Sequence, residues 1–345
     1  MSNKGKILIF RFSALGDVAM TIPVIAALIH DYPEKEIVMV SRPFAKELLA
    51  PFSQITFIAL DARNKHKGFT GLWRLFRELQ DLGPYDYIAD LHNVLRTKIL
   101  RFFFRIAGFR CYKIDKGRKE KKALVRKNNK QLKPLKSTFE RYRDVFAAAG
   151  ETFTLKDFNI QKQYIPSAFE APHAAFNQTG HHIGIAPFAG HQWKTWPEEK
   201  MRQLISGLAA EGHQVYLFGG RGKEQQTLES WASEIKQVHS LAGRLSISDE
   251  LKAMSLLNVM ISMDSANMHL ARLVNTPVVS LWGATHPYAG FYGWQQPIEW
   301  AVQADLSCRP CSVFGNKKCY RGDFACMQRI TPEMVKEKIN LIITQ

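Results

Sequence analysis

The sequence predicts an α/β protein of two domains, each built on a parallel sheet. Three observations carry this prediction. The chain has 345 residues, which is more than a single hydrophobic core usually supports. Short apolar runs alternate with amphipathic stretches, as strands alternate with helices in parallel sheets. This alternation stops near the middle of the chain and then resumes.

The strand-like runs fall into two groups of four. The first group covers residues 7–10, 36–40, 55–60 and 85–91. The second covers residues 182–187, 214–219, 259–263 and 278–282. A basic region and the polar, proline-containing stretch 161–172 interrupt the pattern, and the latter suits a linker. We therefore predict domains at 1–168 and 169–330, and a capped helix over 331–345 that returns to the first domain.

Composition and charge narrow the class of partner. The chain is 46% hydrophobic and 23% charged, which is ordinary for a folded protein, and its net charge is +16. The segment from Arg110 to Lys136 contains twelve Lys or Arg residues and only two acidic residues. An anionic partner is therefore expected: a phosphorylated small molecule, an acidic membrane surface or nucleic acid. We expect neither a membrane span nor a secretory signal, and hence a cytoplasmic protein.

The loop of residues 11–17 follows the first predicted strand and precedes a helical pattern. It therefore lies at the carboxyl end of a strand, where open α/β sheets bind ligands. Gly16 permits a tight turn, and Asp17 presents a carboxylate. By position alone, Asp17 fits equally well as an acid stabilised by the helix dipole.

Residues 263–269 repeat this arrangement in the second domain. Backbone N–H groups at the helix start would attract a diphosphate, with Ser265 and Asn267 as added donors. Asp264 would orient the loop or accept a hydrogen bond from a sugar hydroxyl. The alternative is an ordinary helix cap followed by a packed His269.

Two further loops follow strands of the second domain. Lys194 lies between a strand and a helix, where its charge can neutralise a pyrophosphate; the alternative is a solvated surface lysine. The glycine-rich loop 218–224 matches neither the dinucleotide fingerprint nor the P-loop. Glu224 there is a candidate for a ribose or base contact, or else an acid at the start of a surface helix.

Together these segments resemble glycosyltransferase family 9, the ADP-heptose:lipopolysaccharide heptosyltransferases. The resemblance rests on residues 12–18, on Lys194 ahead of Trp196-Pro197-Glu198, on loop 219–224, on residues 264–273 and 276–287, and on Cys308-Arg309-Pro310-Cys311, Cys319 and Cys326. It implies a GT-B fold, in which two Rossmann-like domains flank a cleft. It also implies that the first domain binds the acceptor and the second binds the nucleotide sugar.

The resemblance also assigns roles to individual residues. Asp17 occupies the place of the catalytic carboxylate, a general base for the acceptor hydroxyl. The donor-binding set is Ser13, Gly16, Lys194, Gly219, Glu224, Asp264, Ser265, Ala266, Asn267 and His269. Many family members have glycine at the position of Ala266 and hydroxyl residues at the positions of Ala189 and Gly190, so the donor pocket differs here.

The predicted function is inverting, metal-independent transfer of heptose or a related sugar to the lipopolysaccharide inner core. The donor is a nucleotide diphosphate sugar, ADP-heptose by resemblance, and the acceptor is a lipid-linked phosphorylated oligosaccharide. One alternative is another nucleotide sugar used for a different surface glycan. Another is nucleic-acid binding, which the charge suggests, but the sequence contains no nucleic-acid-binding module.

A lipid-linked acceptor requires contact with a membrane. Residues 94–107 mix apolar side chains with basic ones, and the basic run follows directly. Such a segment can lie on an anionic surface, here the cytoplasmic face of the inner membrane, or it can hold a phosphorylated lipid acceptor. The residues predicted for acceptor or membrane docking are Arg101, Arg105, Lys119, Lys121 and Lys122. The alternative is a packed helix followed by a solvated loop.

Four late cysteines have spacing that partly fits a zinc site. Cys308 and Cys311 are separated by two residues, and Cys319 and Cys326 follow at wider spacing. A cytoplasmic chain does not normally form stable disulfides. We favour free, packed thiols over a structural zinc ion, and expect catalysis to need no metal or other cofactor.

Overall fold

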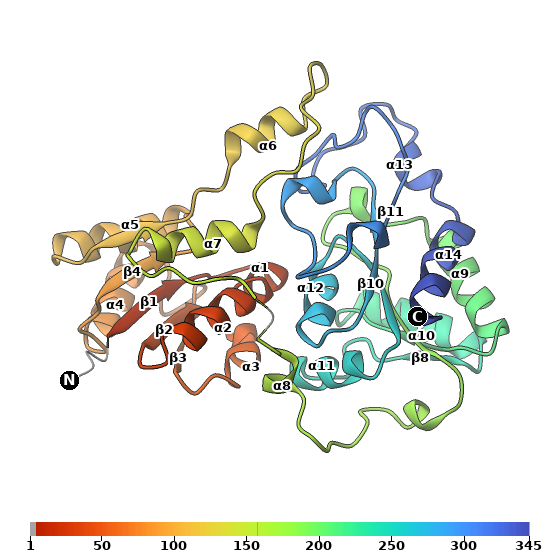
Figure 1. Ribbon diagram of the computed structural model, residues 1–345, viewed down its shortest axis with the longest axis horizontal. Helices are drawn as coiled ribbons and strands as arrows, with labels where there is room; N and C mark the ends of the chain where they lie inside the picture. The colour runs from red at the N-terminus through yellow and green to blue at the C-terminus, as the bar shows by residue number, and fades with distance from the viewer. Residues whose placement is uncertain (1–4, 157, 345) are drawn as a thin grey trace. The chain divides into compact units, whose positions relative to one another are not determined.

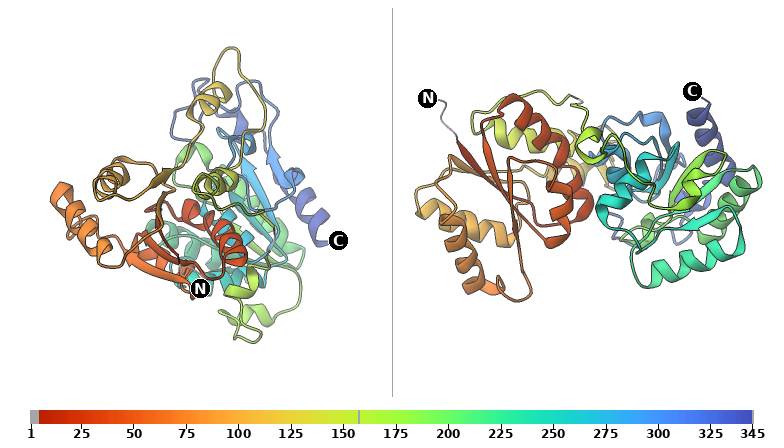
Figure 2. Two further views of the ribbon diagram at one scale, coloured as in Figure 1. Left: turned by 60° about the vertical axis from the view of Figure 1, so that its left-hand side comes forward. Right: turned by 90° about the horizontal axis from the view of Figure 1, so that it is seen from below.

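The computed structural model describes residues 5–156 and 158–344. The chain forms two compact units, each with its own parallel sheet (Figures 1 and 2). The first unit contains the chain up to residue 116 together with residues 138–163. The second contains residues 117–137 together with the chain from residue 164 onward.

The sheet of the first unit has five strands in the order β3-β2-β1-β4-β5. These are β1 (Lys6–Phe10), β2 (Glu36–Ser41), β3 (Ile55–Ala59), β4 (Tyr87–Asp90) and β5 (Cys111–Lys113). The central strand β1 places Ile7 beside Ile37 of β2 and Tyr87 of β4. Four of its five residues are buried, because helices cover parallel sheets on both faces.

The helices of the first unit follow these strands. They are α1 (Leu15–Ala19), α2 (Ile22–Asp31), the 3₁₀ turn η1 (Pro43–Ala45), α3 (Lys46–Leu49), α4 (Gly68–Gln80), α5 (Leu95–Ile106) and α7 (Thr138–Ala147). Apolar side chains of α4 and α5 join those of β1, β2 and β4 in one core. The short α8 (Gln161–Tyr164) leads into the second unit.

The sheet of the second unit has six strands in the order β11-β10-β9-β6-β7-β8. These are β6 (His182–Ala186), β7 (Gln214–Leu217), β8 (Val238–Ser240), β9 (Val259–Met263), β10 (Val278–Trp282) and β11 (Ala301–Gln303). Its helices are α6 (Arg118–Leu124), α9 (Glu198–Ala210), α10 (Lys223–Glu234), α11 (Ile247–Ser255), α12 (Ala266–Leu273), α13 (Ala325–Gln328) and α14 (Pro332–Ile343). Its 3₁₀ turns are η2 (Ala174–Asn177), η3 (Gln192–Lys194), η4 (Pro287–Ala289) and η5 (Ile298–Trp300).

All eight predicted strands are present. The sequence missed β5, β8 and β11, each of which has three residues and lies at the edge of its sheet. Three residues are too few to show the alternation that marks a half-buried strand. These strands extend the sheets but do not change the order of the inner ones.

The predicted domain boundaries were wrong for the basic segment 117–137. This segment leaves the first unit after β5 and packs on the second. The Leu135 N–H donates to the Tyr288 carbonyl at 2.9 Å, and Lys130 Nζ donates to the Ser307 carbonyl at 3.1 Å. The Lys121 ammonium lies 4.1 Å from the centre of the Phe291 ring, which is a cation–π contact.

The C-terminal helix α14 does not return to the first unit, so that expectation was wrong. Val335 and Ile339 on α14 are buried in the core of the second unit, beside Ile330 and Met327. Its start is as predicted, because the Thr331 hydroxyl accepts a hydrogen bond from the Met334 N–H at 3.3 Å. The apolar face of α14 is therefore buried by the unit to which the helix is connected in sequence.

Candidate functional site

Each sheet has one point at which the strand order reverses. In the first unit, the chain runs outward through β2 and β3 on one side of β1, and through β4 and β5 on the other. In the second unit, β7 and β8 lie on one side of β6, whereas β9, β10 and β11 lie on the other. Open α/β sheets bind ligands outside the carboxyl ends of strands at such switch points. We therefore expect ligand-binding residues in the segments that follow β1 and β4 in the first unit, and β6 and β9 in the second.

The switch point of the second unit brings together two predicted residues, Lys194 and Asp264. Lys194 ends the turn η3 after β6, and Asp264 directly follows β9. The Lys194 Nζ lies 2.9 Å from Asp264 Oδ2, and the two side chains are 15% and 7% exposed. Because an ammonium has three donors, this contact leaves Lys194 able to bind phosphate oxygens as well.

The predicted donors at the start of α12 lie beside this pair in the chain. Ser265 is the N-cap residue with extended backbone, and its hydroxyl lies 3.2 Å from the Ser262 hydroxyl. Ala266 and Asn267 form the first turn, where the N–H groups lack partners within the helix. His269, one turn further, is buried. This burial is compatible with the packed histidine that the sequence left as an alternative, and donor binding by His269 stays a prediction.

The glycine-rich loop after β7 is closed by its own glutamate. The Gly220 N–H donates to Glu224 Oε2 at 2.8 Å, from the first turn of α10. A Cβ atom at Gly219 would come within 2.8 Å of the Leu228 Cδ1 methyl, so a larger residue there would require Leu228 to move. Because β7 neighbours β6, this loop and the Lys194 loop leave adjacent strands. Glu224 thus shapes the loop, whatever it contacts in a ligand.

In the first unit, Asp17 is held in place by Arg11. Asp17 is the third residue of α1, and its Oδ2 accepts the Ala14 N–H at 3.2 Å. The Arg11 Nη2 lies 2.6 Å from the same oxygen, and Arg11 Nη1 donates to the Leu91 carbonyl at 3.0 Å. Arg11 is buried, whereas the Asp17 side chain is 33% exposed. Ser13 precedes α1 and Gly16 is its second residue, so both belong to the first unit, whereas the other predicted donor-binding residues belong to the second.

Sequence reasoning did not assign a role to His92, which lies at the same switch point. His92 follows β4, and its Nδ1 accepts the Phe12 N–H at 3.4 Å. Burial, together with the charges of Arg11, Lys116 and Arg42, lowers the pKa of His92 to about 3. The ring is therefore neutral near pH 7, with its proton on Nε2. The rule that found Asp17, a polar residue just after a strand, would also have found His92.

Tyr142 of α7 supports the same loop from a distant part of the chain. Its hydroxyl donates to the Asp17 carbonyl at 3.3 Å, and the Arg11 guanidinium lies 5.8 Å from the centre of its ring. Tyr142 is completely buried. No local motif predicts such a contact, because 125 residues separate Tyr142 from Asp17.

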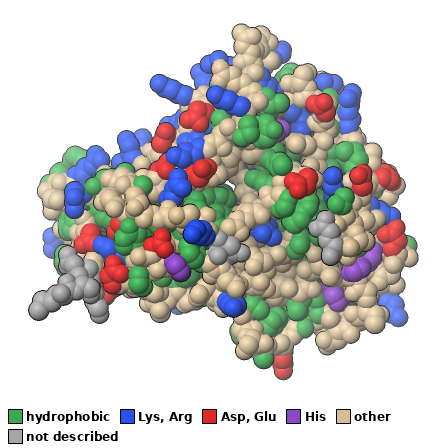
Figure 3. All heavy atoms as spheres, in the orientation of Figure 1, with side chains coloured by type: hydrophobic (Ala, Val, Ile, Leu, Met, Phe, Trp, Pro, Cys, Tyr) green, Lys and Arg blue, Asp and Glu red, His purple; other side chains and the backbone are tan. Residues whose placement is uncertain are grey.

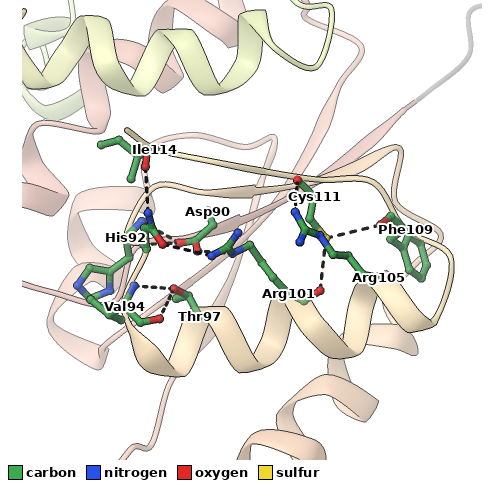
Figure 4. Close-up of polar contacts among 10 residues, drawn as sticks. Asp90, His92, Val94, Thr97, Arg101, Arg105, Phe109, Cys111 and Ile114 are labelled. Atoms are coloured by element: carbon green, nitrogen blue, oxygen red, sulfur yellow. Dashed lines mark hydrogen bonds and ion pairs between the residues drawn. The ribbon is translucent and has the colours of Figure 1, made fainter. Parts of the chain in front are cut away.

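The predicted docking role of Arg101 was wrong. Arg101 points inward from α5, its Nε 2.8 Å from Oδ2 of the buried Asp90, and it donates to Asn93 Oδ1 at 3.2 Å (Figure 4). This ion pair joins α5 to the end of β4. Arg105 lies on the exposed side, where it donates to the Cys111 carbonyl at 3.4 Å. Helical periodicity alone does not show which basic residue pairs with a buried acid.

Lys121 was also wrongly predicted as a docking residue. It is buried against Phe291, whereas Lys119 and Lys122 on the same helix are exposed.

The cysteines are all free. Burial raises the pKa of Cys326 to about 11 and also raises that of Cys311. Among residues 5–156 and 158–344, no three His, Cys, Asp or Glu side chains are grouped to hold a metal ion, and no helix is both long and apolar enough to span a membrane.

Comparison with known proteins places this arrangement among sugar-transferring enzymes. The model of glycosyltransferase family 9 (heptosyltransferase) matches residues 72–319. Lipopolysaccharide heptosyltransferase 3 of Escherichia coli is 27% identical over 285 residues, which cover 78% of this chain and 81% of the relative. Lipooligosaccharide heptosyltransferase 2 of Haemophilus influenzae is 25% identical, with 98% of this chain and 99% of the relative covered.

Solved structures agree with the fold. A family 9 glycosyl transferase from Veillonella parvula has a TM-score of 0.75 at 18% identity, covering 100% of this chain and 98% of its own. The E. coli heptosyltransferase WaaC, solved with ADP-2-deoxy-2-fluoro heptose, has a TM-score of 0.71 at 19% identity, with 97% and 99% covered. The two sheets therefore form a GT-B fold. Since the family model matches well over half of its length, the chain belongs to glycosyltransferase family 9, the heptosyltransferases.

Proposed function

We propose that the protein transfers heptose from ADP-heptose to the inner core of lipopolysaccharide. The observation that carries this proposal is the Lys194–Asp264 pair at the switch point of the second unit, which presents a positive charge suited to a diphosphate. The names of the relatives and the ADP-sugar analogue bound to WaaC support heptose and ADP as donor components.

The donor diphosphate would be bound by a cation and by backbone donors. Lys194 contacts the phosphate oxygens while Asp264 fixes the position of its ammonium. The N–H groups of the first turn of α12, with Ser265 and Asn267, supply further hydrogen bonds. These groups also stabilise the negative charge that builds up on the leaving ADP as the bond to the sugar breaks.

Asp17 would act as the general base. One oxygen, Oδ2, is already used by Arg11 and Ala14, so the proton goes to Oδ1. As the acceptor hydroxyl loses this proton to Asp17, its oxygen attacks the anomeric carbon, the bond to the β-phosphate breaks, and the configuration inverts. The neutral ring of His92 offers an Nε2–H donor in the same loop cluster for an oxygen of the acceptor.

The test is direct turnover. Purified protein is supplied with ADP-heptose and delipidated inner-core oligosaccharide, and ADP release and the glycosylated product are both measured. We expect transfer from ADP-heptose and much slower transfer from a matched panel of other nucleotide sugars. Faster transfer from another donor would contradict the heptose assignment and would point to a different surface glycan, in line with Ala266 in the donor loop.

A further inference from the structure

An apolar surface remains on the first unit that neither the core nor the proposed chemistry uses. Ten large hydrophobic side chains are exposed among the described residues, and five of them lie on the two adjacent helices α4 and α5. They are Phe69, Trp73, Leu95, Phe102 and Ile106. Scattered exposed apolar residues are ordinary, but a cluster of this kind marks an interaction surface. We call these five residues, with the groove between them, the α4–α5 face.

Folding does not explain the α4–α5 face, because each helix also has a separate buried stripe. Leu72, Leu75 and Leu79 of α4, with Leu100 and Phe104 of α5, fill the core. The exposed side chains form a second stripe. On α5, Leu95, Phe102 and Ile106 recur at helical spacing, and Ile106 is 72% exposed. A helix that is apolar on two sides needs a second apolar environment.

A groove runs along the α4–α5 face. Its volume is about 220 Å³, and it is lined by Trp73, Phe76, Arg77, Gln80, Phe103 and Ile106, together with Ala107. The rings of its aromatic wall pack against one another: the centres of Trp73 and Phe103 are 5.1 Å apart, and those of Phe76 and Phe103 are 5.5 Å apart. The size and apolar lining suit a segment of hydrocarbon chain.

Basic side chains surround this apolar surface. Arg74 and Arg77 are exposed on α4, and Lys98 and Arg105 are exposed on α5. The acid within the two helices is Glu78, whose carboxylate pairs with Lys65 at 2.9 Å and with His66 at 3.2 Å. Hydrophobic and basic side chains alternate along the edge of the molecule where α5 lies (Figure 3). Exposed apolar and basic side chains on the same two helices complement anionic headgroups above hydrocarbon.

We propose that the α4–α5 face docks on an anionic phospholipid bilayer. The proposal rests on the proposed function, because a lipid-linked acceptor lies at such a surface. A second copy of this chain fits less well, since a symmetric contact would bring Arg74, Arg77, Lys98 and Arg105 against their own copies. We place the docking surface on the α4–α5 face and not on the basic segment 117–137, because that segment packs on the second unit and buries Lys121.

Vesicle flotation tests this proposal without any turnover. Wild-type protein is mixed with vesicles of phosphatidylethanolamine and phosphatidylglycerol, and separately with neutral phosphatidylcholine vesicles. We expect binding to the anionic vesicles that weakens as salt rises. Phe102→Ser with Ile106→Ser should lower the partition coefficient about tenfold or more. Arg77→Gln with Lys98→Gln should lower it about fivefold per charge removed.

Two controls match these variants. Ile298→Ser with Leu341→Ser removes two exposed apolar side chains from the second unit, and Lys119→Gln with Lys122→Gln removes two exposed charges from α6. Both should bind vesicles like wild type. Circular dichroism and ADP affinity should be unchanged in all four variants, which shows that they fold. Failure of ADP-heptose turnover in the wild type would count against the proposed function and leave vesicle binding to be judged separately.

Three results would overturn the docking proposal. One is wild-type protein that fails to bind anionic vesicles or binds neutral ones equally well. Another is loss of binding in the α6 control with retention in the α4–α5 variants, which would make the basic segment the docking surface. The third is a concentration-dependent dimer in sedimentation velocity that Phe102→Ser with Ile106→Ser abolishes, which would make a second copy the partner.

Discussion

The two switch points use the same pair of charges in opposite ways. In the first unit the cation is buried and the carboxylate is accessible, with side chains of Arg11 and Asp17 that are 7% and 33% exposed. In the second unit the carboxylate is the more buried partner, with Lys194 at 15% and Asp264 at 7%. The switch point of the first unit thus exposes a negative group, and that of the second unit exposes a positive group.

This difference shows how one architecture supports two kinds of chemistry. In each pair the more buried partner balances the charge and fixes the geometry, and under the proposed function the more exposed partner contacts the ligand. An accessible carboxylate suits proton removal from a hydroxyl, whereas an accessible ammonium suits a diphosphate. Substitution of each accessible partner should therefore affect a different step.

The largest expected effect follows from Asp17→Asn. The amide keeps the shape of the side chain but cannot take the proton, so kcat should fall by about 10²–10⁴-fold. ADP affinity should stay within about twofold, because Asp17 lies in the first unit. Steady-state kinetics and calorimetry with ADP measure the two quantities. Turnover near the wild-type level would show that Asp17 is not the base.

Lys194→Ala should instead weaken ADP binding. We expect a loss of about 1.5–3 kcal/mol, the range for a hydrogen bond to a charged group. Adenosine affinity should change far less, because the nucleoside lacks the phosphate charge. Calorimetry with both ligands separates these effects. Equal losses for ADP and adenosine would place Lys194 away from the diphosphate. The Lys194–Asp264 pair would then not differ from the Arg11–Asp17 pair in the way proposed.

The sequence predicted Asp17 and both members of the Lys194–Asp264 pair, but it did not predict Arg11, the buried partner of Asp17. Asp17 lies in α1 shortly after β1, and Lys194 ends η3 after β6, and these positions can be predicted from the local pattern. Tyr142 and the contact between Arg11 and Leu91 join parts of the chain 125 and 80 residues apart. A single sequence does not show which residues far apart in the chain are in contact.

The same limit explains the errors in the basic region. Arg101 and Arg105 are one helical turn apart, and both looked like surface cations. The buried carboxylate of Asp90 lies beside Arg101 and not beside Arg105, which only the packing of α5 on β4 decides. Likewise, the charge of segment 117–137 suggested a free surface, whereas its contacts with Tyr288, Phe291 and Ser307 place it on the second unit.

The role of the buried partner can be tested with Arg11. Arg11→Gln should lower kcat about tenfold or more without changing donor KM, because Asp17 loses the group that orients it. Arg11→Lys should restore part of this loss, since a lysine keeps the charge but cannot contact both Asp17 and the Leu91 carbonyl in the same geometry. Thermal unfolding should accompany the kinetics. A change in donor KM with kcat preserved would assign Arg11 to the donor and not to Asp17.

The smallest expected effect concerns acid stability, and it compares the two units through one histidine in each. Burial lowers the pKa of His92 to about 3 and that of His286 to about 4, and each ring accepts a backbone N–H through Nδ1. Above pH 6.5 both rings are neutral whether the chain is folded or unfolded, so they add no pH dependence. As pH falls below 6.5, the unfolded chain binds protons that the folded chain does not, and the free energy of unfolding decreases.

His92→Asn removes this penalty while its amide oxygen can still accept the Phe12 N–H. Between pH 7.5 and 4.5, the first unit of the variant should therefore lose less stability than that of the wild type, by about 2.7 kcal/mol. His286→Asn is the matched variant for the second unit and should protect only that unit. Urea unfolding at both pH values, followed by hydrogen exchange to resolve the two units, provides the measurement. If His92→Asn loses as much stability in acid as wild type, the ring is already protonated in the folded protein, and the neutral Nε2–H donor proposed for the acceptor is lost with it.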